Sequence, residues 1–402
     1  MKISPSQLTF SLISLTVFLP SFVYVYLSTT SLAHGLLVTI LIIFATSFRC
    51  VTYASRKTIF DILKLATFAV PFQIMAFYVT DGLITGKTVL SIFLLGAVFF
   101  SSIFIANLLV KLNFKDIKTI LKKLSILLLF FGIFALIFDI SLFGYGNYAK
   151  SIFPFSEPSH YALSIGPILF TTGFFLKPKY RNFLVLILFI FGVTLKSLIL
   201  LVFSVFLILY YYKARYIPIF ISVFLSVFFL FDGVFFDATY FIDRLSLLGG
   251  QNLSVLVYIQ GWENILIALE QSYGFGVGFG NIANTLIGDT GELIYSLSGE
   301  YKNRTDGSFL ASKLISEFGV FGIFLIAIYI KLFLRSSRFL KATIFANFYL
   351  NQNSQYSAIQ VLSSAFIVSF SIELFIRGYG YFSPGVLIFL IALFLQGSER
   401  KT

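Results

Sequence analysis

The sequence predicts an all-α, polytopic helical membrane protein. Of its 402 residues, 58% are hydrophobic and only 11% are charged, and the mean hydropathy is +0.95. A soluble domain needs a largely polar surface and cannot hide that many apolar side chains, whereas a helical membrane protein exposes them to lipid. The apolar residues also fall in runs close to the length of about 20 residues that crosses a bilayer. We therefore expect membrane-spanning helices separated by short polar loops.

Twelve apolar runs mark the expected spans, and one long polar segment interrupts them. The runs 183–195 and 198–212 are short, and we expect them to form a tight hairpin around Lys196. The long segment divides the chain into helices with short loops at 1–231, a large loop subdomain at 232–317, and further helices with the C-terminal tail at 318–402. The expected spans are approximately 8–27, 32–48, 63–79, 89–110, 124–143, 161–176, 183–195, 198–212, 217–231, 318–334, 356–376 and 385–395.

The positive charges are distributed unequally between the two sides that alternating spans define. With the N-terminus in the cytoplasm, nineteen of the 29 Lys and Arg residues fall in cytoplasmic segments and eight fall outside, as the positive-inside rule requires. We therefore expect both termini in the cytoplasm and the loop 232–317 on the outer side. The net charge of +12 is scattered in small groups between apolar runs, which argues against nucleic acid as a partner.

The scarcity of metal-binding side chains limits the chemistry that the chain can perform. A single cysteine, Cys50, excludes an intramolecular disulfide, and the only histidines are His34 and His160. We therefore expect no metal site. The first apolar run is too long for a signal-peptide core and lacks a cleavage site of small residues, so we expect it to be the first span.

A first polar cluster lies where the chain re-enters the apolar region after residue 143. Glu157 and His160 flank Pro158, which bends the chain. An ionisable pair at membrane depth is costly and usually functional. The structural alternative is a helix cap, in which Ser159 caps the following helix and Glu157 lies near its positive end.

A second cluster begins the large loop, which holds ten of the 17 acidic residues and the single tryptophan, Trp262. Arg244 can hold a diphosphate through bidentate hydrogen bonds. The alternative is an ion pair with Asp243 or Asp237 on a solvated surface. Further along, the glycine-rich run 274–280 lacks the Lys-Ser/Thr of a phosphate-binding loop, so a structural turn is its favoured interpretation.

A third cluster closes the large loop. Arg304 and Lys313 are suited to hold a polyanion just above the membrane, and Asp306 is suited to orient them or to accept a proton. The alternative is a capped helix entrance, with Ser308 or Asp306 as the N-cap.

Two further acidic residues are candidate partners for these cations. Glu373 and Arg377 have the i,i+4 spacing of a helical pair, so Glu373 either forms a structural ion pair with Arg377 or positions it for function. Asp139, near the outer end of the fifth expected span, is another candidate partner.

Taken in order along the whole chain, these segments resemble the O-antigen polymerase (Wzy) family of bacterial membrane glycosyltransferases. The resemblance is carried by Phe155-Ser156-Glu157-Pro158-Ser159-His160-Tyr161-Ala162, Asn252-Leu253-Ser254, Gln260-Gly261-Trp262-Glu263, Gly276-Val277-Gly278-Phe279-Gly280, Asp306-Gly307-Ser308-Phe309 with Lys313, Glu317-Phe318-Gly319 and Glu373-Leu374-Phe375-Ile376-Arg377-Gly378.

The resemblance implies a GT-C-like enzyme in the bacterial inner membrane with a periplasmic active site. It would transfer a glycan chain from undecaprenyl diphosphate to the non-reducing end of a new lipid-linked repeat unit. The implied partners are the undecaprenyl-diphosphate-linked glycan, membrane lipid and a polysaccharide chain-length regulator, with no cofactor.

The chemistry of that reaction suggests a role for each candidate residue. Cations would stabilise the diphosphate leaving group, a carboxylate or imidazole would accept the proton of the attacking hydroxyl, and aromatic and amide groups would bind sugars. Glu157 is the favoured base. The candidate cations are Arg244, Arg304, Lys313 and Arg377, the candidate bases are Glu157, His160 and Asp306, and the candidate sugar-binding residues are Trp262 and Asn252.

Three other functions remain open at this point. An O-antigen ligase, which passes the chain to lipid A-core, would share the fold and the charges. A flippase for the same lipid-linked glycan would also have twelve spans, but would not be expected to gather polar residues in one outer loop. A purely structural membrane protein would not need the grouped outer Arg and Glu residues.

Overall fold

The computed structural model describes residues 4–29, 31–47, 56–80, 82, 84–138, 142–148, 151–230, 238–246, 252–345 and 355–398. Within these ranges the chain is helical, and extended pairing is limited to two isolated bridges, Ile152 with Phe155 and Tyr379 with Tyr381. The predicted all-α class is therefore confirmed.

The helices of the described chain coincide with the expected apolar runs and add short helices in the large loop. The α-helices are α1 Pro5–Tyr26, α2 Leu32–Ser47, α3 Arg56–Val79, α4 Gly86–Val110, α5 Phe114–Ile137, α6 Pro158–Phe174, α7 Pro178–Thr194, α8 Leu198–Tyr211, α9 Ile217–Leu230, α10 Ala238–Leu245, α11 Leu253–Gln271, α12 Asp289–Ser298, α13 Leu310–Phe345, α14 Gln355–Phe375 and α15 Pro384–Ser398, and short 3₁₀ turns are η2 Leu142–Asn147, η3 Ala214–Tyr216 and η4 Ile282–Asn284.

Six helices of the described chain are long and apolar enough to cross a membrane: α1, α4, α5, the 59–79 part of α3, the 310–344 part of α13 and the 358–375 part of α14. Shorter apolar helices lie within α2, α8 and α15. Their length and composition make this a membrane-embedded helical protein.

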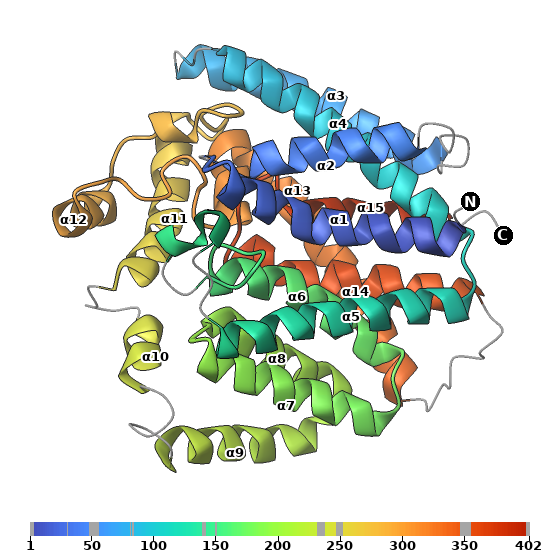
Figure 1. Cartoon of the computed structure of the whole chain (residues 1–402). Helices are drawn as coiled ribbons and strands as arrows, with labels where there is room; N and C mark the ends of the chain where they lie inside the picture. The colour runs from blue at the N-terminus through green and yellow to red at the C-terminus, as the bar shows by residue number, and fades with distance from the viewer. Residues whose placement is uncertain are drawn as a thin grey trace.

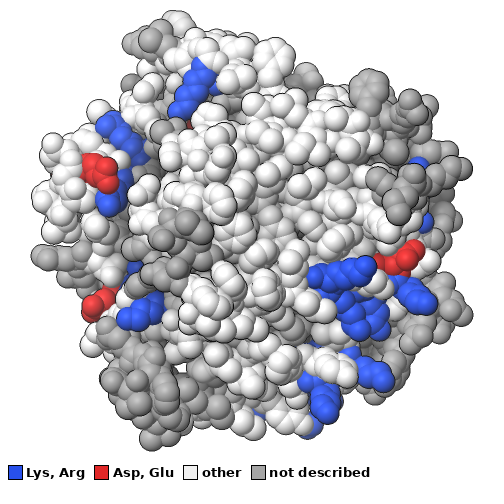
Figure 2. Space-filling view, viewed as in Figure 1, with Lys and Arg blue, Asp and Glu red and all other residues white. Residues whose placement is uncertain are grey.

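The long helices run side by side, and the two ends of the bundle differ. Figure 1 shows α10, α11 and α12 gathered at one end, whereas both chain termini lie at the other. On the face drawn in Figure 2, Lys and Arg lie toward these two ends, and the surface between them is almost free of charge. An uncharged band between two charged ends is the surface that a bilayer requires.

The core lies around α6 and α14, in the middle of the bundle in Figure 1. Every residue of α6 from Tyr161 to Phe174 is buried. Buried hydroxyls bond to carbonyls of neighbouring helices: Tyr161 donates to Leu128 at 2.9 Å and Tyr211 donates to Phe170 at 2.6 Å. Lipid offers no hydrogen-bonding partner to these polar groups, so the bonds between helices satisfy them and fix the helices relative to one another.

Two helices are longer than the apolar runs that predicted them. The basic segment 111–123, expected as a loop, is mostly helical, because Asn113 caps α5 through the Asp116 amide at 2.8 Å. In its first turns Ile117 and Ile120 are buried while Lys115 is exposed, the helical periodicity of an amphipathic segment. Similarly, α13 begins at Leu310 instead of residue 318.

The glycine-rich run is a structural turn, as the sequence favoured. It packs on a kink of α13 at Gly319, where the backbone has φ 57° and ψ −135°. The Gly278 amide donates to the Glu317 carbonyl at 3.1 Å, and the Val320 amide donates to the Gly274 carbonyl at 2.9 Å. A Cβ on Gly319 would lie 2.0 Å from the Gly274 carbonyl oxygen, so the close approach requires glycine.

A test of the packing compares two helical glycines. A Cβ on Gly35 would lie 2.3 Å from the Pro20 carbonyl oxygen of α1, whereas a Cβ on Gly96 would meet nothing within 4 Å. We expect Gly35→Ala to lower the free energy of unfolding by about 1–3 kcal/mol because it overpacks the α1–α2 contact. Gly96→Ala should leave it unchanged or raise it by up to about 1 kcal/mol through helix propensity. Thermal unfolding in detergent measures both, and equal stability of Gly35→Ala and wild type would contradict this packing.

Candidate functional site

A cavity of about 500 Å³ is lined in part by residues of α10 and α11. These two helices lie at the end of the bundle opposite the chain termini in Figure 1. Of the described residues that line it, four carry ionisable charge: Glu157, Lys196, Arg244 and Arg377. One carboxylate thus faces three cations. The remaining lining is largely apolar or aromatic and comprises Pro158, Ser159, Ser197, Leu198, Ile199, Val202, Tyr240, Leu245, Ser254, Val255, Tyr258 and Ile376.

Glu157 is positioned by the start of α6. It is the N-cap residue, with Pro158 in the first turn, but its side chain makes no cap hydrogen bond. Instead, Ser159 Oγ donates to Oε1 at 2.5 Å, and Arg377 Nη2 lies 3.5 Å from the same oxygen. Among the described residues no hydrogen bond reaches Oε2, and the Glu157 side chain is 40% exposed. Ser159 therefore does not cap α6, and one oxygen of the Glu157 carboxylate remains available to a ligand.

His160 lies behind Glu157 and is not part of the cavity lining. Its side chain is only 11% exposed, with Nε2 3.2 Å from Glu157 Oε1 and Nδ1 2.7 Å from Ser156 Oγ. A neutral imidazole satisfies both contacts by donating at Nε2 and accepting at Nδ1. The Tyr379 ring packs edge-on against it at 4.1 Å between centroids. His160, expected as one of the candidate bases, thus orients Glu157 in this structure.

The ionisation of Glu157 is set by opposing effects. Burial raises the pKa of its carboxyl group, but the neighbouring His160 and Arg377, together with the hydrogen bonds from Ser159 and Arg377, lower that pKa more. The resulting pKa lies below the ordinary value, so the group is a carboxylate at neutral pH.

Arg377 reaches the cavity from the end of α14, and its partner differs from the expected one. The helix ends at Phe375, so the i,i+4 geometry expected with Glu373 is not continued. Arg377 pairs with Glu157 instead. Glu373 is buried and accepts a hydrogen bond from Ser383 Oγ, which ties α14 to the start of α15. The expected Glu373–Arg377 contact is therefore replaced by two separate interactions.

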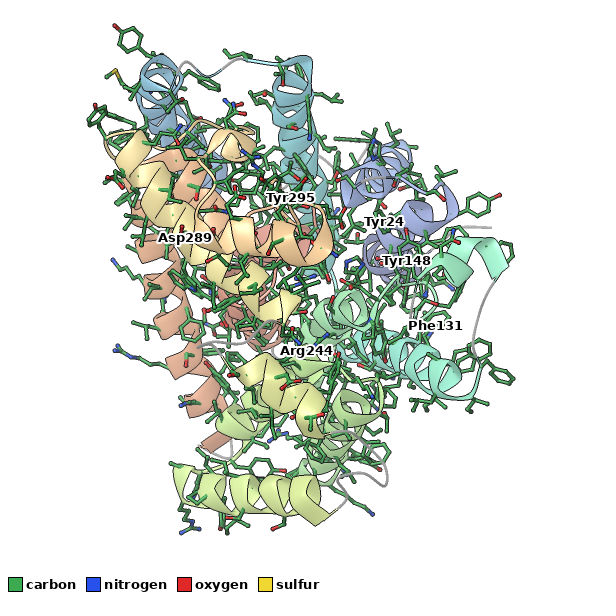
Figure 3. All side chains as sticks on the ribbon, turned by 90° about the vertical axis from the view of Figure 1, so that its left-hand side faces the viewer. Tyr24, Phe131, Tyr148, Arg244, Asp289 and Tyr295 are labelled. Carbon is green, nitrogen blue, oxygen red and sulfur yellow. The ribbon has the colours of Figure 1, made fainter. Side chains whose placement is uncertain are left out.

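Arg244 lies on the short helix α10, near the centre of the end-on view in Figure 3. Its guanidinium lies over the Tyr240 ring, 4.2 Å from the centroid. No ion pair joins it to Asp243 in the described chain, and Asp237 lies outside the described residues. Phe241 is buried against Phe189 of α7 and fixes α10 to the bundle.

Lys196 and Tyr240 are cavity residues that the sequence did not identify. Lys196 was expected only as the centre of a helical hairpin, and α7 and α8 do form that hairpin around it. The Tyr240 hydroxyl donates to the Lys196 carbonyl at 2.8 Å. A lone lysine between two apolar runs was the available signal, but only the fold brings it to the same cavity as Glu157.

The third predicted cluster lies apart from this cavity. Arg304 Nη2 donates to the Thr285 carbonyl at 3.3 Å, and Lys313 Nζ donates to the Thr305 carbonyl at 2.8 Å and lies 4.0 Å from Glu317. The loop between α14 and α15 contacts both this cluster and the cavity. Its Arg377 lines the cavity, and a Cβ on its Gly380 would lie 3.4 Å from Lys313 Nζ and 3.9 Å from an Asp306 carboxylate oxygen. The expected helix cap is absent at Ser308, whose buried Oγ has no partner among the described residues.

The expected sugar-binding residues lie on α11. Trp262 is 45% exposed and packs against Phe309 and Tyr258, and Tyr258 lines the cavity. The Asn252 side chain caps α11 by accepting from the Ser254 amide at 3.0 Å. Asp139, the further expected partner for the cations, lies outside the described residues.

Two tyrosines add aromatic surface beside His160. Figure 3 shows Tyr24 and Tyr148 next to each other at this end of the molecule. Their rings are 6.1 Å apart, and the Tyr24 ring is 6.2 Å from that of His160.

No group of three or more His, Cys, Asp and Glu side chains in the described chain is arranged to hold a metal ion. No protein-family model matches the chain, and no curated protein is significantly similar to it.

The lowered pKa of Glu157 predicts a pH-dependent contribution to stability. Because the pKa is lower in the folded than in the unfolded chain, the interactions of the carboxylate stabilise the fold at neutral pH. That contribution is lost as the pH falls through the folded-state pKa. We expect Glu157→Gln to be less stable than wild type at pH 7, with the difference shrinking in acid. Melting temperatures across pH measure this, with the exposed Glu300→Gln as control. A difference that is independent of pH would contradict it.

Proposed function

We propose that this protein is an O-antigen polymerase of the bacterial inner membrane. It joins undecaprenyl-diphosphate-linked repeat units by transferring the growing glycan chain to the non-reducing end of a new unit. The single observation that carries the proposal is the cavity in which Glu157 faces Lys196, Arg244 and Arg377 beside an apolar wall. The sequence resemblance described above supports it independently.

The cavity suits the two ends of a lipid-linked donor. Cations in a partly dry site bind a diphosphate and stabilise the charge that grows on it as it leaves. Leu198, Ile199 and Val202 of α8 give the same cavity an apolar side, which suits the first isoprene units of the lipid. A volume of about 500 Å³ is in the range of ligand sites.

Glu157 supplies the general base in this proposal. The hydroxyl of the acceptor sugar attacks the anomeric carbon of the donor, and its proton passes to the free Oε2 of Glu157. The new glycosidic C–O bond forms as the bond from the anomeric carbon to the phosphate oxygen breaks. Undecaprenyl diphosphate leaves as an anion that Arg244 and Arg377 stabilise, so its departure needs no protonation. His160 holds the Glu157 carboxylate in position.

We place the cavity on the periplasmic side and both termini in the cytoplasm. The Lys and Arg bias between the two sides supports this orientation. The position of the termini, at the end opposite α10–α12, is compatible with it.

Reporter fusions test the orientation. We expect green fluorescent protein at the C-terminus to fluoresce and alkaline phosphatase at the same position to be inactive, because that end faces the cytoplasm. Alkaline phosphatase inserted after Gly299, at the end of α12, should be active. The opposite pattern of activities would reverse the proposed topology.

The glycan ladder of lipopolysaccharide tests the reaction itself. A strain that lacks this gene should produce core carrying a single repeat unit, because transport and ligation continue without polymerisation. Bare core with lipid-linked polymer outside would indicate a ligase, and bare core with unpolymerised units retained inside would indicate a flippase. An unchanged ladder would rule out all three.

Substitutions in the complemented strain then test the cavity. Glu157→Gln and Arg377→Ala should each reduce polymerisation at least about 100-fold, the usual size of a lost base or charge-stabilising group. Arg338→Ala, an exposed arginine on α13, is the matched control and should give a normal ladder. Membrane protein level is measured in each strain, and normal chain lengths in Arg377→Ala at normal level would remove that residue from the site.

A further inference from the structure

We infer that Lys196 and Arg244, both held over the ring of Tyr240, complete with Arg377 a three-cation site that selects a diphosphate over a monophosphate. This inference rests on the proposed function for the identity of the lipid. It assigns to Lys196 a direct contact with the ligand, and to Tyr240 the role of a positioning residue.

The backbone of Lys196 is the first observation. Lys196 follows the C-cap residue of α7, Leu195, and adopts φ 51°. The Ser197 amide donates to the Gly192 carbonyl at 2.8 Å, and the Lys196 amide donates to the Val193 carbonyl at 3.2 Å. This is the Schellman arrangement, whose left-handed position is normally occupied by glycine. A lysine there is conformationally unfavourable, and backbone strain of this kind points to a role for the side chain.

The ring of Tyr240 is the second observation. Lys196 Nζ lies 5.5 Å from its centroid and Arg244 Cζ lies 4.2 Å from it. The two charges are thus within about 10 Å of each other on one ring. The hydroxyl of Tyr240 also donates to the Lys196 carbonyl, so the Tyr240 side chain connects α10 to the α7–α8 hairpin.

The charge balance of the cavity is the third observation. Three cations repel one another, and the single lining carboxylate, Glu157, already has Arg377 as its ion-pair partner. Arg244 Nε and Arg377 Nε are buried and have no hydrogen-bond partner among the described residues. The guanidinium groups are therefore incompletely satisfied by the protein, and an anion bound in the cavity would compensate their charge. Because Lys196 and Arg244 lie on one ring but up to about 10 Å apart, the two linked phosphoryl groups of a diphosphate reach more of these cations than the single group of a monophosphate.

The experiment measures binding in purified full-length protein in nanodiscs. The probes are undecaprenyl diphosphate, undecaprenyl monophosphate, inorganic pyrophosphate and cardiolipin. We expect wild-type protein to bind the lipid diphosphate at least about tenfold more tightly than the monophosphate, from one additional charge-assisted contact. Inorganic pyrophosphate should compete, and cardiolipin should not displace the lipid diphosphate.

Variants at position 196 separate charge from backbone. Lys196→Gly removes the cation and suits the left-handed backbone, so its melting temperature should equal or exceed that of wild type while the preference for diphosphate is lost. Lys196→Asn provides a second charge-free variant that tolerates the same backbone. Lys196→Arg should retain the preference. The matched charge control is Lys302→Ala, a lysine of the large loop paired with Glu300 at 3.4 Å and outside the cavity lining.

Variants of Tyr240 test positioning. Tyr240→Phe keeps the ring but loses the hydrogen bond to the Lys196 carbonyl, so it should weaken the preference for diphosphate, and Tyr240→Leu, which loses both, should abolish it. Wild-type selectivity in both Lys196→Gly and Lys196→Asn would overturn the inference, as would preferential binding of cardiolipin. A normal glycan ladder in the deletion strain, combined with lost selectivity in these variants, would instead reject the polymerase and retain the diphosphate site.

Discussion

Contacts from two distant parts of the chain meet at one oxygen atom, Oε1 of Glu157, and the geometry of the cavity depends on them. Ser159 and His160 approach from the first turn of α6, and Arg377 approaches from the end of α14, 220 residues away. Since a carboxylate in a partly apolar site is stable only when its charge is compensated, these contacts hold α6 and the α14–α15 loop together. They also leave Oε2 of Glu157 without a hydrogen-bond partner among the described residues.

The sequence was sufficient for the fold class because apolar run length and secondary structure are tightly coupled in a membrane. A helix coincides with each expected apolar run, and the hairpin of α7 and α8 is present. Six helices of the described chain are long and apolar enough to cross a membrane, so the expected number of twelve spans stays a prediction. Helix boundaries were less predictable. The basic segment 111–123 was expected as a loop, yet its apolar residues repeat with helical spacing and Asn113 caps the helix that contains them. High charge obscured that periodicity.

The sequence identified most of the charged residues of the cavity, but it did not show which candidate residues lie together. Glu157, Arg244 and Arg377 were identified from residue type and position, and the fold brings them to one cavity. Arg304 and Lys313 were identified by the same reasoning, yet they bind carbonyl groups and Glu317 elsewhere. Lys196 was overlooked as a site residue. Local spacing also suggested a Glu373–Arg377 pair, which fails because the helix ends between them. Contacts across hundreds of residues are set by packing, which a single sequence does not display.

The shortness of the α7–α8 hairpin has a consequence for the surrounding lipid. With 17 and 14 residues, these helices are about 26 Å and about 21 Å long, whereas the hydrocarbon core of a bilayer is about 30 Å thick. A hydrophobic segment shorter than the bilayer is accommodated by local thinning, by snorkelling of flanking side chains or by association with other helices. The loop of this hairpin carries Lys196. Local thinning of the bilayer at this hairpin would therefore bring phospholipid headgroups toward the rim of the cavity that Lys196 lines.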